Sequence, residues 1–151
     1  MKGKIIQIIG SVVDVEFPEG SNLPAIYNAL RVKNEGPASA KGYGEAKEVI
    51  LEVVKHLDLT RVKTISLQST DGLSRGLEVQ DTEDQILVPV GNEVLGNIFN
   101  VVGEVLSETH SPDGSGQAQK FKKFLPIHRP SPSFTDQVTK TEIFETGIKV
   151  I

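Results

Sequence analysis

The sequence predicts an all-β fold for the first half of the chain, from a bias among its apolar residues and from the spacing of its turns. The chain contains 17 Val and 13 Ile against 12 Leu. Side chains that branch at Cβ suit a half-buried pleated sheet better than a helix. The 14 Gly and 8 Pro recur between the apolar segments, where they punctuate short strands. Short strands separated by turn residues are typical of a small barrel or sandwich.

The first strand-like segment runs from Lys4 to Phe17. Val13 and Val15 alternate with acidic residues, which is the period of a strand with one buried face. Ile6, upstream, is apolar on the opposite parity, so the phase changes near Gly10-Ser11. An extra residue or a glycine kink at that point would explain the change, as in the bulges that curl a sheet into a barrel. A straight strand buried on both faces is the alternative.

Four further strands follow before residue 82, separated by turns, one of which is expected at Asp58 to Arg61. Ser69 to Gly72 is a strong turn signal, because an Asp-Gly pair favours positive φ. Closing such strands into a barrel removes exposed sheet edges. We expect these strands at Ala29 to Lys33, Glu48 to Leu57, Val62 to Leu67 and Leu77 to Gln80.

The character of the chain changes after Asp81-Thr82. Gln85 to Val90 resembles a strand, but Pro89 excludes a central position in a sheet. Asn92 to Leu95 is expected to form one helical turn. The prolines of Pro126 to Pro132 favour an extended chain that is neither helix nor central strand. Asn34 to Lys47 is expected to be a solvated loop, and Ser107 to Lys120 a second polar loop. Thr139 to Ile151 looks like an element cut short.

The composition excludes several functional classes. The chain has 151 residues, a net charge of −4 and no Cys, so disulfide frameworks, Cys-based zinc sites and thiol catalysis are ruled out. An acidic chain argues against nucleic-acid binding. No apolar run reaches the roughly 18 residues that a membrane helix needs. We expect no signal or transit peptide, because a strand-like segment follows Met1 at once. The length suggests one domain, or one domain and part of another.

One segment has the glycine spacing of a phosphate-binding P-loop. A P-loop from Gly91 to Gly96 would require a following Lys and a hydroxyl residue, to reach the phosphates and the magnesium. Asn97 and Ile98 occupy those two positions. A turn flanked by flexible glycines is therefore the interpretation that we adopt for this segment.

No other residues form a catalytic, cofactor-binding or metal-binding constellation. The three histidines lack metal-ligand spacing. We place His56 on the barrel surface, His110 in a polar loop, and His128 in an interface or packing role. Asp113 to Gly116 lacks the later ligands of a calcium loop. Glu142 and Glu145 could face one side of a helix, where we interpret them as a solvated charged face and not as a catalytic acid–base pair. The residues alone thus indicate a non-enzymatic β-barrel fragment.

Taken in order, several segments resemble the β subunit of the F-type ATP synthase. Each alone is moderately specific, and the ordered set is highly specific. The sister α subunit and the vacuolar-type subunits share the plan, but the segment at 127–134 is similar to the β type. The matching segments are Gly3 to Val15, Leu23 to Leu30, Leu51 to Leu57, Thr70 to Gly76, Val88 to Gly91, Leu95 to Glu104, Ile127 to Phe134 and Glu145 to Ile151.

The resemblance implies a six-stranded closed β-barrel at residues 1–82, followed at 83–151 by the incomplete start of an α/β P-loop nucleotide-binding domain. In that family the P-loop, the magnesium-binding acid, the general-base Glu and the adenine-stacking aromatics lie further along the chain. This chain would therefore hold neither ATP or ADP nor Mg. Two segments depart from the family pattern, Asn34 to Lys47 and Val105 to Lys122, since both look longer than usual.

The function implied is that of a parent protein which couples proton translocation to ATP synthesis by rotary catalysis. Its partners would be α subunits in an alternating hexamer and the central-stalk γ subunit. It would lie at the soluble face of an energy-transducing membrane, on the cytoplasmic side of a bacterium or in an organelle, without entering the bilayer. The fragment itself would supply assembly contacts and no catalysis. Two alternatives are an independent β-barrel module that binds an oligonucleotide or a protein, and an unstable truncation product.

Overall fold

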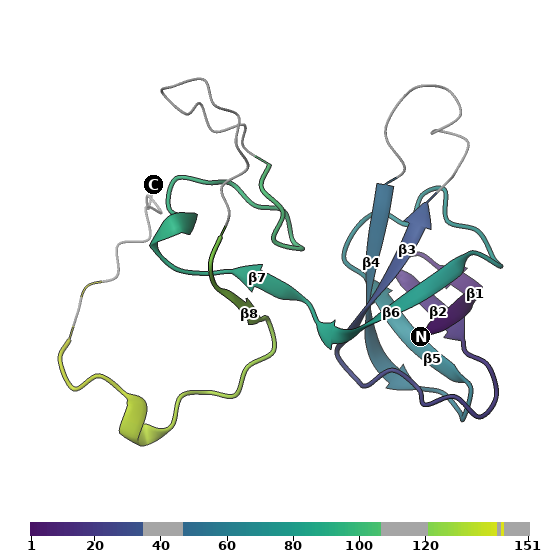
Figure 1. The fold of residues 1–151 in the computed structure, drawn as a ribbon, viewed down its shortest axis with the longest axis horizontal. Coiled ribbons are helices and arrows are strands. Elements are labelled where there is room, and N and C mark those ends of the chain that lie inside the picture. Colours follow the sequence, from purple (N-terminus) through teal and green to yellow (C-terminus); the bar gives the residue numbers. More distant parts are fainter. Residues whose placement is uncertain (35–46, 107–120, 142, 144–151) are drawn as a thin grey trace.

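Six antiparallel strands close into a barrel in the order β1-β2-β5-β4-β3-β6. The computed structural model describes residues 1–34, 47–106, 121–141 and 143. Figure 1 shows the barrel on the right and the rest of the described chain on the left. The closed barrel expected from the sequence is thus confirmed. Its strands are β1 (Lys2–Ile9), β2 (Val12–Glu16), β3 (Asn28–Asn34), β4 (Lys47–His56), β5 (Arg61–Ser66) and β6 (Glu78–Gln85).

The first apolar segment is a hairpin and not the single kinked strand that we expected. β1 and β2 pair up to Ile9 opposite Val12, which leaves Gly10 and Ser11 as a two-residue turn. Gly10 has a φ of 58°, a conformation that glycine adopts without a steric penalty. This turn causes the change of phase, because Ile8 pairs with Val13 and the two therefore lie on the same face of the sheet. A bulge earlier in β1 changes the phase a second time. Ile5 pairs with Val15 and Gln7 with Asp14, so Ile6 is the extra residue.

The expected strands at Ala29 to Lys33, Glu48 to Leu57 and Val62 to Leu67 are confirmed as β3, β4 and β5. The strand expected to end at Gln80 continues to Gln85. This extension contains an irregularity, because the pairing with β3 shifts between Asp81 and Gln85. The Asp81 carboxylate organises it by accepting hydrogen bonds from the Glu83 N–H at 3.0 Å and from Asn28 Nδ2 at 3.2 Å.

The core fills the inside of the barrel with alternate residues of every strand. Fully burying one Val, Leu or Ile side chain stabilises a fold by roughly 1.5–3 kcal/mol. The buried Thr64 satisfies its hydroxyl by donating to the Val13 carbonyl oxygen at 2.7 Å. The buried cluster consists of Ile5, Val13, Val15, Phe17, Leu30, Val32, Val49, Leu51, Val53, Val62 and Val79.

The chain beyond the barrel holds short elements only. β7 (Leu87–Pro89) pairs with β8 (Phe124–Pro126) in a two-stranded sheet. The expected helical turn is present as a 3-10 turn, η2 (Asn92–Val94), and a second 3-10 turn, η3 (Phe134–Asp136), lies nearer the C-terminus. Within the described ranges no P-loop domain is seen. The expected loops at 34–47 and 107–120 and the element after Thr139 fall largely outside the described residues.

Large apolar side chains beyond the barrel remain exposed. Leu95 is 76% exposed, Phe134 89% and Ile143 92%. No helix in the described part of the chain has the length and apolar character needed to cross a bilayer.

Replacing Gly3 by alanine is expected to destabilise the barrel. A Cβ at Gly3 would lie 2.8 Å from the Glu16 carbonyl oxygen and 2.9 Å from both Phe17 Cε1 and Val15 Cγ1. Because one of these contacts is backbone, β1 and β2 would have to separate. Overpacking of this kind costs about 1–3 kcal/mol, which equilibrium unfolding in urea measures as a lower midpoint.

The neighbouring Lys4→Ala variant is the control, because Lys4 is exposed on the outer wall of the barrel. Its free energy of unfolding should stay within about 0.5 kcal/mol of the parent value. A Gly3→Ala variant as stable as Lys4→Ala would contradict the close packing of β1 against β2.

Candidate assembly interface

Two of the three histidines that sequence analysis singled out lie in packing contacts. His56 Nε2 lies 2.8 Å from the Pro24 carbonyl oxygen, and His128 Nε2 lies 2.9 Å from Glu52 Oε2. The contact of His128 agrees with the packing role predicted for it. Among the described residues, no group of three or more His, Asp or Glu could hold a metal ion. Four other candidates lie outside the described residues: His110, Asp113 to Gly116, Glu142 and Glu145.

The segment with P-loop-like glycine spacing forms a turn. Gly91 and Gly96 have φ values of 113° and 80°, and the 3-10 turn η2 lies between them. The Asn97 amide donates to the carbonyl oxygens of Glu93 and Val94 at 3.2 and 3.4 Å. This side chain thus stabilises the turn from within. The segment is the glycine-flanked turn that the sequence predicts.

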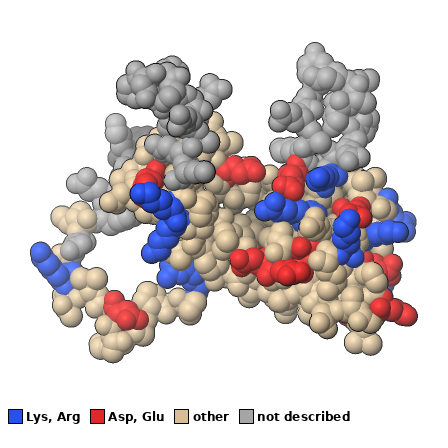
Figure 2. All heavy atoms as spheres, viewed as in Figure 1, with Lys and Arg blue, Asp and Glu red and all other residues tan. Residues whose placement is uncertain are grey.

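One wall of the barrel carries charges of both signs. We call this surface the charged wall; it lies on β1, β6, β3 and the start of β4. Lys2 Nζ lies 2.7 Å from Glu78 Oε1, and Arg31 Nη1 lies 3.7 Å from Glu48 Oε2. A shallow groove of about 390 Å³ runs across it. Figure 2 shows basic and acidic side chains interspersed over the barrel half of the molecule. The charged wall consists of Lys2, Lys4, Arg31, Lys33, Glu48 and Glu78.

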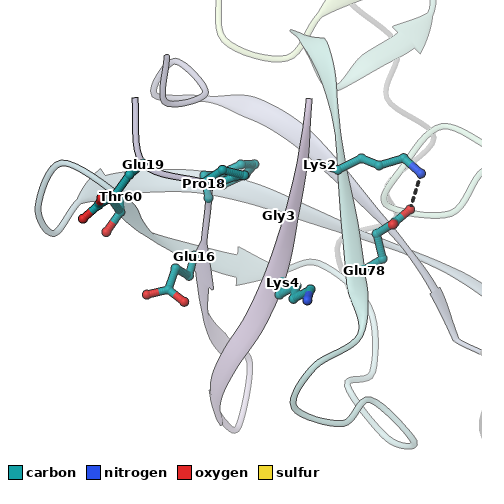
Figure 3. Close-up of a pocket in the computed structure, with 9 residues that line it drawn as sticks. Lys2, Gly3, Lys4, Glu16, Pro18, Glu19, Thr60 and Glu78 are labelled. Atoms are coloured by element: carbon teal, nitrogen blue, oxygen red, sulfur yellow. Dashed lines mark ion pairs between the residues drawn. The ribbon is translucent and has the colours of Figure 1, made fainter. Parts of the chain in front are cut away.

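A second groove, of about 420 Å³, opens where β1 diverges from the segment after β2. Figure 3 shows the ion pair of Lys2 and Glu78 on one side of it, and Glu19 and Thr60 on the other. The charged side chains that line it are all exposed to solvent. General acid–base catalysis needs a carboxyl or amine whose proton affinity is altered by burial or by a close charge. Exposed and mixed charges instead suit the recognition of another polar surface.

The opposite wall of the barrel carries a row of apolar side chains. Ile9 pairs with Val12, and Val12 pairs with Ile65, so the three lie side by side across β1, β2 and β5. Ile9 is 63% exposed and Ile65 is 38% exposed. We call these three residues the apolar row. Exposed apolar groups of this kind, next to polar neighbours, are typical of contact surfaces between proteins.

A tight turn between β4 and β5 presents another apolar group. Asp58 Oδ1 accepts hydrogen bonds from the backbone N–H groups of Thr60 at 2.9 Å and Arg61 at 2.8 Å. Asp58 Oδ2 accepts a further bond from Arg61 Nε at 2.6 Å. These bonds, that of the Arg61 side chain first, lower the pKa of Asp58 to about 2. The turn is therefore held by its own side chains, and Leu59 at its tip is 90% exposed.

The turn from Asp58 to Arg61 was predicted from the sequence and is confirmed. The apolar row was not predicted. Ile9 and Ile65 are 56 positions apart, and only the strand register brings them to one surface. The turn could be predicted because it is local: Asp58 and Arg61, whose side chains form an ion pair, are three positions apart between two apolar segments.

The chain was compared with models of known protein families. Residues 5–83, more than half of the chain, match the β-barrel domain of the ATP synthase alpha/beta family. The matched segment covers nearly all of the six strands of the barrel.

The carboxyl group of Asp58 is expected to titrate at about pH 2. A lowered pKa in the folded state means that the turn is stabilised above the ordinary Asp value of 3.8 and that this contribution is lost as the pH falls through about 2. Carbon-detected NMR titration of the side-chain carboxyl measures the midpoint.

An Arg61→Gln variant removes the largest cause of the shift and should move the Asp58 midpoint upward, toward 3.8. Lys63→Gln, on the same strand, should leave the midpoint unchanged. A wild-type midpoint near 3.8 would contradict the turn geometry.

Proposed function

The chain belongs to the ATP synthase alpha/beta family, and we propose that it is the N-terminal part of a β-type subunit that contributes assembly contacts to a catalytic hexamer. The observation that carries the proposal is the closed barrel, which coincides with the family match at residues 5–83. The β type is favoured by the segment from Ile127 to Phe134. The parent protein would make ATP from ADP and phosphate, driven by proton translocation through rotation of a central stalk.

The two unlike walls of the barrel support assembly with a different chain. A ring built by head-to-tail contacts joins two different surfaces of neighbouring subunits. The charged wall is centred on β6 and β3 and the apolar row on β2 and β5, which face them across the closed sheet, while β1 contributes one end to each. In this proposal each barrel contacts α subunits on both sides, and the γ subunit contacts the parent protein elsewhere.

Residues 83–151 form, in this proposal, the beginning of the nucleotide-binding domain, after a barrel at 1–82. The exposed Leu95 and Phe134 support this division, since a complete domain would cover them. No catalytic, cofactor-binding or metal-binding role is assigned to a residue of this chain. ATP, ADP and Mg would be held by later parts of the full-length protein, which would lie peripherally at the soluble face of its membrane.

A protein partner suits the barrel better than an oligonucleotide does. The lysines and arginine of the charged wall alternate with Glu48 and Glu78, which pair with two of them. Acidic side chains within a surface repel phosphates, and binders of single strands usually present stacked aromatics along a basic groove. Alternating signs instead give register and specificity to a contact between two proteins.

We expect the chain to associate with an α-type subunit and not with a second β-type chain. Native mass spectrometry of the mixtures at micromolar concentration distinguishes the two. Ile65→Lys places a charge in the apolar row without entering the core, and should weaken the association at least about tenfold.

Leu95→Lys is the matched control, because it adds the same charge to an exposed apolar residue outside the barrel. Its association should equal that of the parent chain. Failure to bind any α-type partner, or equal loss of binding in both variants, would overturn the proposed assembly role.

Calorimetric titration with Mg-ATP is expected to show no binding to this chain. The turn at Gly91 to Gly96 offers neither a Lys nor a hydroxyl residue at the next two positions, where phosphates and magnesium would be held. Micromolar affinity that persists in excess inorganic phosphate would contradict the absence of a nucleotide site. A full-length β-type subunit serves as the positive control.

A further inference from the structure

The chain that follows the barrel returns to touch its outer wall. The Ile127 N–H donates to the Ile86 carbonyl oxygen at 3.0 Å, directly after the pairing of β8 with β7. The next residue, His128, then lies against the barrel. Two segments more than 40 residues apart in the sequence are therefore joined at the point where the chain leaves β6.

His128 makes two side-chain contacts with the barrel. Its Nε2 lies 2.9 Å from Glu52 Oε2 on β4. Its ring stacks on the ring of Tyr27, with centroids 4.1 Å apart and planes inclined by 26°. One imidazole thus bridges a carboxylate and an aromatic face.

The surroundings of Glu52 partly remove this contact from water. The Glu52 side chain is 15% exposed, and its neighbours across the sheet are Ala29 and Ile65, both apolar. His128 is the ion partner that the structure gives this carboxylate. Charges that are partly removed from water are screened less than fully exposed ones.

Tyr27 is held in a strained conformation that presents its ring. Its φ is 74°, which is uncommon for a residue with a bulky side chain. Its backbone N–H donates to the Val53 carbonyl oxygen at 2.8 Å, next to Glu52 on β4. Strain of this kind persists only where surrounding contacts impose it, and such residues concentrate at functional positions.

We propose that Tyr27, Glu52 and His128 form a pH-sensitive latch that fixes the post-barrel chain to the barrel wall and closes more tightly when His128 is protonated. An imidazolium forms a charge-assisted hydrogen bond with Glu52 and a cation–π contact with Tyr27, whereas neutral imidazole makes weaker versions of both. The titratable groups facing the ring are the Glu52 carboxylate from β4 and the Tyr27 phenol from the β2–β3 connection, and Arg129 follows along the chain.

Amide hydrogen exchange at Ile127 tests the latch in the full chain. The protection factor, which corrects for the chemical effect of pH on exchange, should be higher at about pH 6 than at about pH 8, the interval in which histidine changes charge. His128→Gln should lower protection at pH 6 about three- to tenfold, as for a charged hydrogen bond at a partly exposed site, and should abolish its pH dependence.

Three further variants separate a latch from a general loss of structure. Glu52→Gln should reproduce the effect of His128→Gln, and the double variant should lose no more than either single one, because the two groups act together. Glu16→Gln, two strands away on the outer wall, should leave Ile127 protection unchanged. The two single variants at His128 and Glu52 and the double variant should leave the protection of the core amide of Leu30 unchanged. Protection at Ile127 that is independent of pH, or unaffected by His128→Gln, would overturn the proposal.

Discussion

Closure of the sheet between β1 and β6 is the constraint on which the rest of the barrel depends. Lys2, Gly3 and Lys4 pair with Gln80, Val79 and Glu78, and this short contact converts an open sheet of six strands into a barrel without free edges. Closure forces β1 to bend from one neighbour to the other. The bulge at Ile6 and the absence of a Cβ at Gly3 permit that bend. Because the sheet is closed, its outer surface faces every direction, and β6 and β3 lie across the barrel from β2 and β5.

The strands themselves could be predicted from the sequence, because one buried face imposes a period of two on Val, Ile and Leu. The hairpin could not, since the two residues Gly10 and Ser11 reverse the chain without interrupting the apolar run. A change of parity has the same appearance whether it marks a bulge or a turn. The position of β6 was difficult for another reason: its last residues are acidic, and the Asp81 side chain stabilises their irregular pairing in place of apolar packing.

The contact surfaces were harder to predict than the core, because register between distant strands determines them. Nothing local marks Ile9 and Ile65 as parts of one surface, and an isolated exposed apolar residue is ordinary. The packing role of His128 was easier to predict. Its neighbouring prolines indicated an extended segment with a packing role, but its partners Tyr27 and Glu52 lie too far away in the sequence to be inferred from spacing. The Asp58 turn was the opposite case, since its hydrogen bonds join residues at most three positions apart.

The strand order also determines when the barrel can form. The β1–β2 hairpin joins neighbours and can form as soon as Glu16 has been synthesised. By contrast, β2 can pair with β5, and β1 with β6, only after much more of the chain has been made. The paired residues are about 50 positions apart for β2 and β5 and about 75 for β1 and β6. Contacts at such separation carry a loop-closure cost before any pairing repays it, so they slow folding. The β1 edge of this hairpin therefore stays unpaired until β6 has left the ribosome. The pairing of β1 with β6 is the last part of the barrel to form.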